Sequence, residues 1–148
     1  MPLTHNLLAR LTEQSGLADA VAALVRDHLR TGQLYLARAQ VKDSAIRRLA
    51  TRVDLRALVR VSWADASGRN LPQPDPWPPG VWLLERAEAL GVRDSAPKPF
   101  LQGRDVLAEG VSAGPQIGEL LRRAYELQLE GGLADRDQAL AWLRAQSA

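Results

Sequence analysis

The chain has 148 residues, enough to bury a core as one domain or as two very small ones. It lacks cysteine, which excludes disulfides and thiolate zinc sites. Its net charge is +2, no signal-peptide pattern opens it, and no apolar run approaches the roughly 20 residues that cross a bilayer. We therefore expect a cytoplasmic protein without a membrane segment.

The small net charge conceals an uneven distribution along the chain. Residues 38–69 hold eight basic and three acidic side chains, whereas residues 104–148 hold five basic and seven acidic ones. A basic centre beside a mildly acidic C-terminal part fits a polyanionic partner that contacts the middle of the chain. An ordinary solvated face explains the charge alone equally well.

The chain is expected to be helical, because its aromatic residues are few and its β-branched residues are outnumbered by Ala, Leu and Arg. The first helix is predicted over residues 3–15 and ends at Gly16, and the second covers residues 17–31 and ends at Gly32. Residues 33–42 lack a clear period and are expected to form a loop. The apolar stripe of the second helix consists of Val21, Leu24, Val25, His28 and Leu29.

Two helices rich in arginine are predicted next. Asp43 or Ser44 is expected to cap the first, and Asp54 the second, which ends at Gly68. The first helix turns Ile46, Leu49 and Ala50 inward and displays Arg47, Arg48 and Arg52 off that stripe. The second turns inward Leu55, Leu58, Val59, Ser62, Trp63 and Ala66.

A proline-rich stretch follows at residues 70–80, with five prolines in eleven positions. Proline disfavours both helix and central strand, so an extended linker is predicted there. It is the expected boundary between a helical region of residues 1–69 and a second one of residues 81–148.

Beyond the linker, a helix over residues 81–90 stopped by Gly91 and a loop over residues 92–103 are predicted. A helical hairpin then turns between Gly110, suited to a left-handed position, and Pro115, suited to a first helical turn. Its long helix places on one face Ile117, Leu120, Leu121, Ala124 and Leu127.

Gly118 lies inside that long helix, which suggests that another segment approaches it closely. Asp135 is expected to cap a last helix, whose buried side holds Ala139, Leu140, Trp142 and Leu143. No alternating strand pattern occurs, so the predicted fold is all-α, an array of about seven or eight short helices with a C-terminal helical hairpin.

Few residues suggest enzyme chemistry. No HExxH, GxSxG, Walker A or GxGxxG pattern occurs, and the two histidines are far apart. His5 is expected to be exposed, and His28 is better explained as a core histidine with one hydrogen bond than as a metal ligand. Asp65, in an otherwise apolar run, needs Arg69, a backbone cap or a metal as its partner.

Arginine recurs every four residues at positions 48, 52, 56 and 60, although a break near Asp54 interrupts the row. Such a row can follow a phosphate backbone, or it can be a solvated face paired with Asp43 and Asp54. The turn from Gly110 to Pro115 also allows comparison with helical hairpins that bind nucleic-acid backbones through main-chain amides.

The stretch from Lys98 to Leu143 resembles the C-terminal tail of bacterial tRNA nucleotidyltransferases and the related poly(A) polymerases. The matching features are Pro99, Gly103-Arg104-Asp105, Gly110, Gly114-Pro115, Ile117-Gly118, Gln128-Leu129-Glu130-Gly131, Ala139, Leu140 and Trp142. The residues around His28 resemble a late helix of the HD domain in multifunctional members. The region behind that domain is matched by Asp43, Arg47, Arg48, Asp65, Gly68 and Arg69.

Two parts of the family pattern have no counterpart in this sequence. One is the catalytic head, with a glycine-serine element and a DxD carboxylate pair that holds two Mg²⁺ ions. The other is the His-Asp doublet of the HD domain. The resemblance therefore implies a chain that is not catalytic by itself and that meets Mg²⁺ only through such a head.

In the family, the tail helices contact tRNA through its backbone and shape, which implies an RNA-engaging module here. The implied phosphate contacts are Lys42, Arg47, Arg48 and Arg52, with amides around Gly114 and Gly118 as a second site. One alternative is a remnant metal-dependent phosphohydrolase that uses His28 and Asp65. Another is a helical interaction domain for a separately encoded catalytic head, and the oligomeric state stays open.

Overall fold

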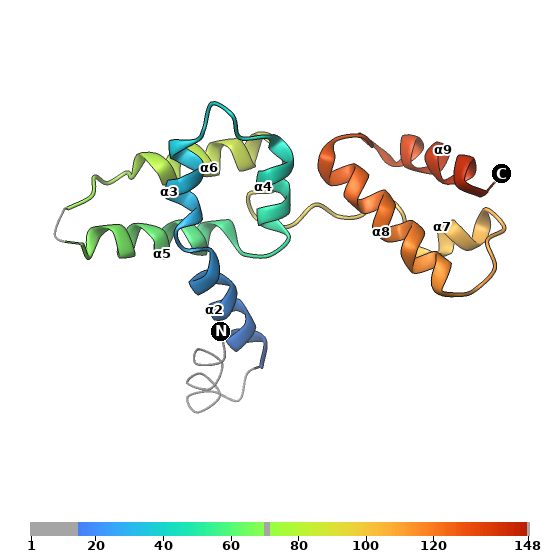
Figure 1. The fold of residues 1–148 in the computed structure, drawn as a ribbon, viewed down its shortest axis with the longest axis horizontal. Helices are drawn as coiled ribbons and strands as arrows, with labels where there is room; N and C mark the ends of the chain where they lie inside the picture. Colours follow the sequence, from blue (N-terminus) through green and yellow to red (C-terminus); the bar gives the residue numbers. More distant parts are fainter. Residues whose placement is uncertain (1–14, 70–71, 148) are drawn as a thin grey trace. The chain divides into compact units, whose positions relative to one another are not determined.

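The computed structural model describes residues 15–69 and 72–147. Within these ranges the chain forms eight helices and no strand, which confirms the all-α prediction (Figure 1). The helices are α2 (Ser15–Asp27), α3 (Arg30–Leu36), α4 (Asp43–Ala50), α5 (Leu55–Ser67), α6 (Pro78–Ala89), α7 (Gly103–Ala108), α8 (Pro115–Glu130) and α9 (Arg136–Ser147). The first predicted helix, over residues 3–15, and His5 lie outside the described residues, apart from Ser15, which begins α2.

The chain divides into two compact units, Met1–Ala96 and Pro97–Ala148. The proline-rich composition predicts the division at residues 70–80 instead. Helix α6 explains the difference, because it packs against α3, α4 and α5 and contributes Leu83 and Ala87 to their core. The packing is close: a Cβ atom added at Gly80 would lie 2.6 Å from Cγ1 of Val59.

The beginning of the first unit differs from the sequence-based prediction. Gly16 lies in the first turn of α2, and Gly32 lies inside α3, so neither glycine ends a helix. Helix α2 stops earlier, at Asp27, and α3 fills the first half of the predicted loop. Tertiary packing overrides the low helix propensity of Gly32, since its neighbour Thr31 is fully buried and hydrogen-bonded to Ser62 of α5.

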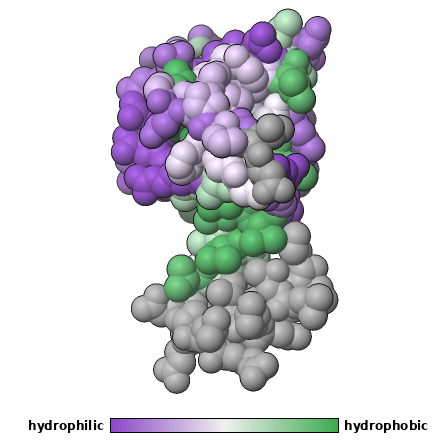
Figure 2. Space-filling model, turned by 90° about the vertical axis from the view of Figure 1, so that its left-hand side faces the viewer, coloured by the Kyte–Doolittle hydropathy of each residue, from purple (hydrophilic) through white to green (hydrophobic). Residues whose placement is uncertain are grey.

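The buried side of α2 also differs from the predicted stripe. Ala22 and Asp27 are its buried residues, whereas Val25 and Leu29 are exposed by more than a third. Figure 2 shows apolar side chains gathered on the surface near α2, while hydrophilic side chains cover most of the remaining face.

Helices α4 and α5 form as predicted, with a different first cap. Lys42 is the N-cap of α4 and makes no side-chain cap bond, while Asp43 lies in the first turn and pairs with Arg86 of α6. Asp54 caps α5, accepting a hydrogen bond from the backbone N–H of Ala57 at 2.7 Å. Trp63 was expected to point inward but is exposed.

Helix α6 begins at Pro78, three residues earlier than predicted. The prediction that residues 70–80 contain no helix is wrong at their end. Proline is well tolerated in the first turn of a helix, where the N–H that it lacks would have no helical partner. Gly91 then adopts a φ of 65° just beyond the helix end.

The second unit follows the predicted hairpin. Gly110 has a φ of 83°, and Pro115 opens α8, which packs against both α7 and α9 (Figure 1). Asp135 accepts a hydrogen bond from the backbone N–H of Gln138 at 2.8 Å, as expected for a cap of α9. The predicted close approach to Gly118 is wrong, because no other described segment comes within 4 Å of a Cβ added there.

Candidate nucleic-acid interface

Four basic side chains line one groove of the first unit. The groove, of about 450 Å³, lies between the start of α3, the segment before α4, and α4 itself. Its lining residues are Arg30, Leu34, Gln40, Val41, Lys42, Ser44, Ala45, Arg48, Leu49 and Arg52. Because no acidic and no aromatic side chain is among them, we refer to it as the cationic groove.

Three of the four side chains predicted to contact phosphate meet in this groove. Lys42 stands at the start of α4, Arg48 in its last turn, and Arg52 just beyond its end. Arg47 is half-buried and does not line the groove. Arg30 was missed, because no local pattern relates it to α4; only the packing of α3 brings it there.

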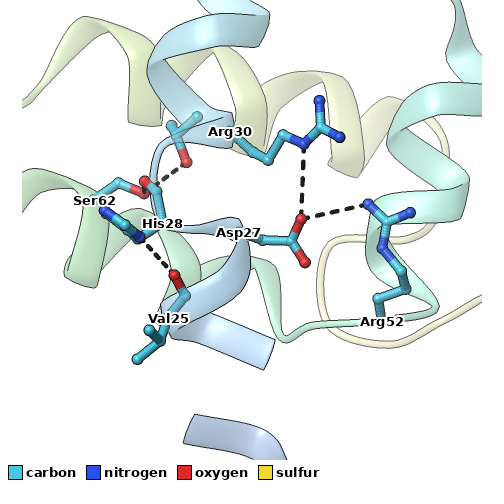
Figure 3. Close-up of polar contacts among 7 residues, drawn as sticks. Val25, Asp27, His28, Arg30, Arg52 and Ser62 are labelled. Carbon is cyan, nitrogen blue, oxygen red and sulfur yellow. Dashed lines mark hydrogen bonds and ion pairs between the residues drawn. The ribbon is translucent and has the colours of Figure 1, made fainter. Parts of the chain in front are cut away.

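A buried carboxylate lies next to two of these arginines. Asp27, the last residue of α2, is 4% exposed. Figure 3 shows it between Arg30 and Arg52, with its Oδ1 at 3.7 Å from Nε of Arg30 and 3.6 Å from Nη2 of Arg52. Its Oδ2 is buried without a hydrogen-bond partner among the described residues.

The arginines of α5 do not extend the groove into a longer row. Arg56 pairs with Asp94 at 2.7 Å, and Arg60 lines a different pocket, beside Trp63. Because a turn separates α4 from α5, arginines four residues apart in the sequence do not lie on one continuous helix face. The basic side chains of the groove therefore come from α4, its two ends and α3, and not from α5.

The two weak metal candidates line a separate pocket of about 250 Å³. Asp65 pairs with Arg69, and His28 donates from Nδ1 to the carbonyl oxygen of Val25 at 2.6 Å. The pairing with Arg69 is one of the three partners that the sequence offered for Asp65. His28 makes one hydrogen bond, as expected, but is only partly buried and does not lie in the core. In residues 15–69 and 72–147 no three His, Asp or Glu side chains gather to hold a metal ion. The donor set therefore does not fit a metal pair.

The proposed amide site lies in the second unit, at the start of α8. Pro115 has no N–H, and the N–H of Ile117 donates to the carbonyl oxygen of Gly114 at 3.1 Å. Gly114 and Gly118 are both exposed. Fewer amides are available there than the sequence suggests, and the role of these two glycines stays a prediction.

The sequence is related to one enzyme of known activity. An A-adding tRNA nucleotidyltransferase of Deinococcus radiodurans is 29% identical over 143 residues, which cover 96% of this chain and 32% of that enzyme. The chain is a distant homologue of part of that enzyme. It spans about a third of the relative's length.

The other comparisons add no closer assignment. No family model matches the chain, and no solved structure matches it. The resemblance inferred from the glycines and arginines is thus confirmed by the one enzyme described above. Across the described ranges, no helix combines the length and the apolar character needed to cross a membrane.

Proposed function

We propose that this chain binds RNA, with tRNA as the expected partner, by contacting phosphates in the cationic groove. The observation that carries the proposal is the convergence of four basic side chains, and no acidic one, on one groove. The distant homology to part of a tRNA nucleotidyltransferase supports tRNA as the RNA. With that partner, we expect the protein to act in the cytoplasm.

The groove is suited to a nucleic-acid backbone rather than to bases. Arginine and lysine supply N–H donors for phosphate oxygens, and no aromatic side chain in the lining offers a stacking surface. An eight-residue helix such as α4 spans about 12 Å. Lys42 and Arg52, at its two ends, can therefore address different phosphates of one strand.

The side chains that line the groove include four basic ones and no acidic one, which favours an anion. Arg30 and Arg52 share a single carboxylate, that of Asp27, and no other described acid lines the groove. The four bases keep a surplus of positive charge, which attracts a polyanion and releases its counterions on binding.

Nucleotidyl transfer is not part of the proposal for this chain. The sequence contains no Gly-Ser dipeptide. Its one Asp-x-Asp triplet, Asp135-Arg136-Asp137, lies at the start of α9 in the part that resembles the tail, where Asp135 caps the helix. Mg²⁺ would belong to the family's catalytic head, and a separately encoded head is a possible protein partner, testable by co-purification. The amides near Gly114 and Gly118 are proposed as a secondary backbone contact.

Binding of tRNA, followed by fluorescence anisotropy between about 50 and about 300 mM salt, tests the proposal. Lys42→Ala and Arg48→Ala should each weaken binding several-fold. Each should also reduce the slope of log affinity against log salt by about 0.7–0.9, the value expected for one lost phosphate contact.

Arg60→Ala is the matched control, because it removes the same charge from an exposed site outside the groove. It should leave the salt slope unchanged. Arg47→Ala tests whether the contact surface extends beyond the groove. Absence of tRNA binding by the wild-type chain at the lowest salt would sink the proposal.

The alternative of a remnant phosphohydrolase depends on His28 and Asp65, which line the same pocket but are too few among the described residues to hold a metal pair. Metal content after purification and hydrolysis of a phosphomonoester test it. Bound metal lost in His28→Ala, together with phosphatase activity, would favour it over RNA binding.

A further inference from the structure

The cationic groove has a feature that RNA binding alone does not require. A carboxylate, Asp27, is buried next to two of its arginines, although a negative charge close to a polyanion site opposes binding. Burial of a carboxylate is costly unless it is paired. Its two partners among the described residues, Arg30 and Arg52, both line the groove.

The contact geometry leaves the arginines available to a ligand. The side chains of Arg30 and Arg52 are 54% and 45% exposed, while that of Asp27 is 5% exposed. At 3.7 and 3.6 Å the pairs lie beyond hydrogen-bond distance. Each guanidinium has five N–H donors, so its contact with Asp27 leaves donors free for a phosphate oxygen.

The two arginines come from different elements, which is why a shared anchor matters. Arg30 begins α3 and Arg52 follows α4, and the same Oδ1 atom of Asp27 attracts both (Figure 3). Without it, two long side chains would have to be ordered separately when a ligand binds, at an entropic cost.

We propose that Asp27 is a positioning residue that holds Arg30 and Arg52 in the cationic groove, in place to bind two phosphates of an RNA strand. This inference rests on the proposed RNA binding, and it adds a residue that touches no ligand itself. The direction in which the RNA affinity changes when the charge of Asp27 is removed distinguishes positioning from simple repulsion. Coulomb's law alone predicts that removal of the Asp27 charge tightens RNA binding, whereas loss of positioning weakens it.

Asp27→Asn, which keeps the size and removes the charge, is the direct test. Its affinity for tRNA at constant salt should fall roughly three- to tenfold, the cost of ordering freed arginine side chains. Glu88→Gln is the matched control, because it removes an exposed acid that pairs with Arg93 outside the groove. It should leave binding unchanged or tighter, and unchanged or tighter binding by Asp27→Asn would overturn the inference.

A double-mutant cycle separates positioning from a general structural role. In an Arg30→Ala/Arg52→Ala background, Asp27→Asn should cause no further loss of tRNA affinity. A further loss as large as in the wild-type background would contradict the inference, because the carboxylate would then act through something other than these arginines.

A measurement on the wild-type chain keeps the inference testable if Asp27→Asn does not fold. The side-chain Nε–H groups of Arg30 and Arg52 should be more restricted in NMR relaxation than that of Arg26, an exposed arginine of α2. Equal mobility would refute positioning. If the wild-type chain binds no tRNA, the proposed function fails, whereas this measurement still decides whether Asp27 holds the two arginines.

Discussion

Asp105 shows at the scale of a residue how one buried carboxylate organises the second unit. Its Oδ2 accepts a hydrogen bond from the backbone N–H of Gln102 at 2.7 Å, and its Oδ1 accepts one from Arg136 at 2.6 Å. The start of α7 is thereby tied to the start of α9. The backbone hydrogen bond from Gln102 lowers the pKa of Asp105 most; burial opposes this, and Arg136 lowers the pKa further.

A pH dependence of stability follows from this shift. Since the pKa of Asp105 is lower in the folded chain, its stabilising contribution is complete above the ordinary value of about 4. The contribution is lost as the pH falls through the folded-state pKa. Asp105→Asn should lower the free energy of unfolding at about pH 7 by about 1–3 kcal/mol and flatten its decline below about pH 4.

Urea denaturation followed by circular dichroism, at about pH 7 and below about pH 4, measures the free energy of unfolding of the wild type and of Asp105→Asn. Asp137→Asn, in the exposed first turn of α9, is the control and should change stability by only a few tenths of a kcal/mol. The same acid dependence in Asp105→Asn as in the wild type would contradict the role assigned to Asp105.

At the scale of an element, two glycines of α8 differ in backbone conformation: Gly118 is helical, whereas Gly131, at the helix end, is left-handed. Gly131, just past its end, has a φ of 85°, and the N–H groups of Gly131 and Gly132 donate to Gln128 and Leu127 at 3.0 and 2.9 Å. This is a Schellman ending, which favours glycine because other residues rarely adopt that φ. Gly118 instead lies inside the helix, exposed and with open space around it.

Alanine at these two positions should shift stability in opposite directions. Gly118→Ala should stabilise the chain by about 0.5–1 kcal/mol, because alanine is the better helix former. Gly131→Ala should destabilise it by about 1–2 kcal/mol, because a Cβ is strained in the left-handed region. Thermal unfolding of both variants measures this, and each serves as the control for the other.

A destabilised Gly118→Ala would show that another segment covers this face of α8. The tRNA affinity of the same variant tests the predicted backbone contact at Gly118. Unchanged affinity would restrict the interface to the first unit.

At the scale of the whole molecule, the described residues form two apolar cores, one in each unit. The first unit buries Leu58 and Leu83 among its helices, and the second buries Val106 and Leu143. Each unit has its own apolar cluster, so each is expected to open as its own cooperative unit.

Hydrogen exchange can show this separation. Leu143→Ala should lower the opening free energy of amides in α7 to α9 by about 2–5 kcal/mol and leave those of α5 and α6 unchanged. Leu58→Ala should do the reverse. Equal losses in both units for either variant would mean that the chain unfolds as one unit.

The parts of the fold that were predictable have local causes. Asp54 and Asp135 cap helices by accepting hydrogen bonds from backbone N–H groups three residues ahead. Gly110 adopts a positive φ, which favours glycine. The boundary after Ala96 and the continuation of helix through Gly32 were not predictable. Both depend on packing between helices that are distant in sequence, such as α3 and α6.

The sequence by itself determined that the chain is helical, where most helices end, and that positive charge gathers in residues 38–69. Local hydrogen bonding, propensity and charge spacing decide these properties. Only the tertiary structure decided which bases share a groove, because helix periodicity orders side chains on one helix and not between helices. Lys42, Arg48 and Arg52 lie close together in the sequence and were predicted. Arg30 and Asp27 join them because α3 and α4 both pack against α6.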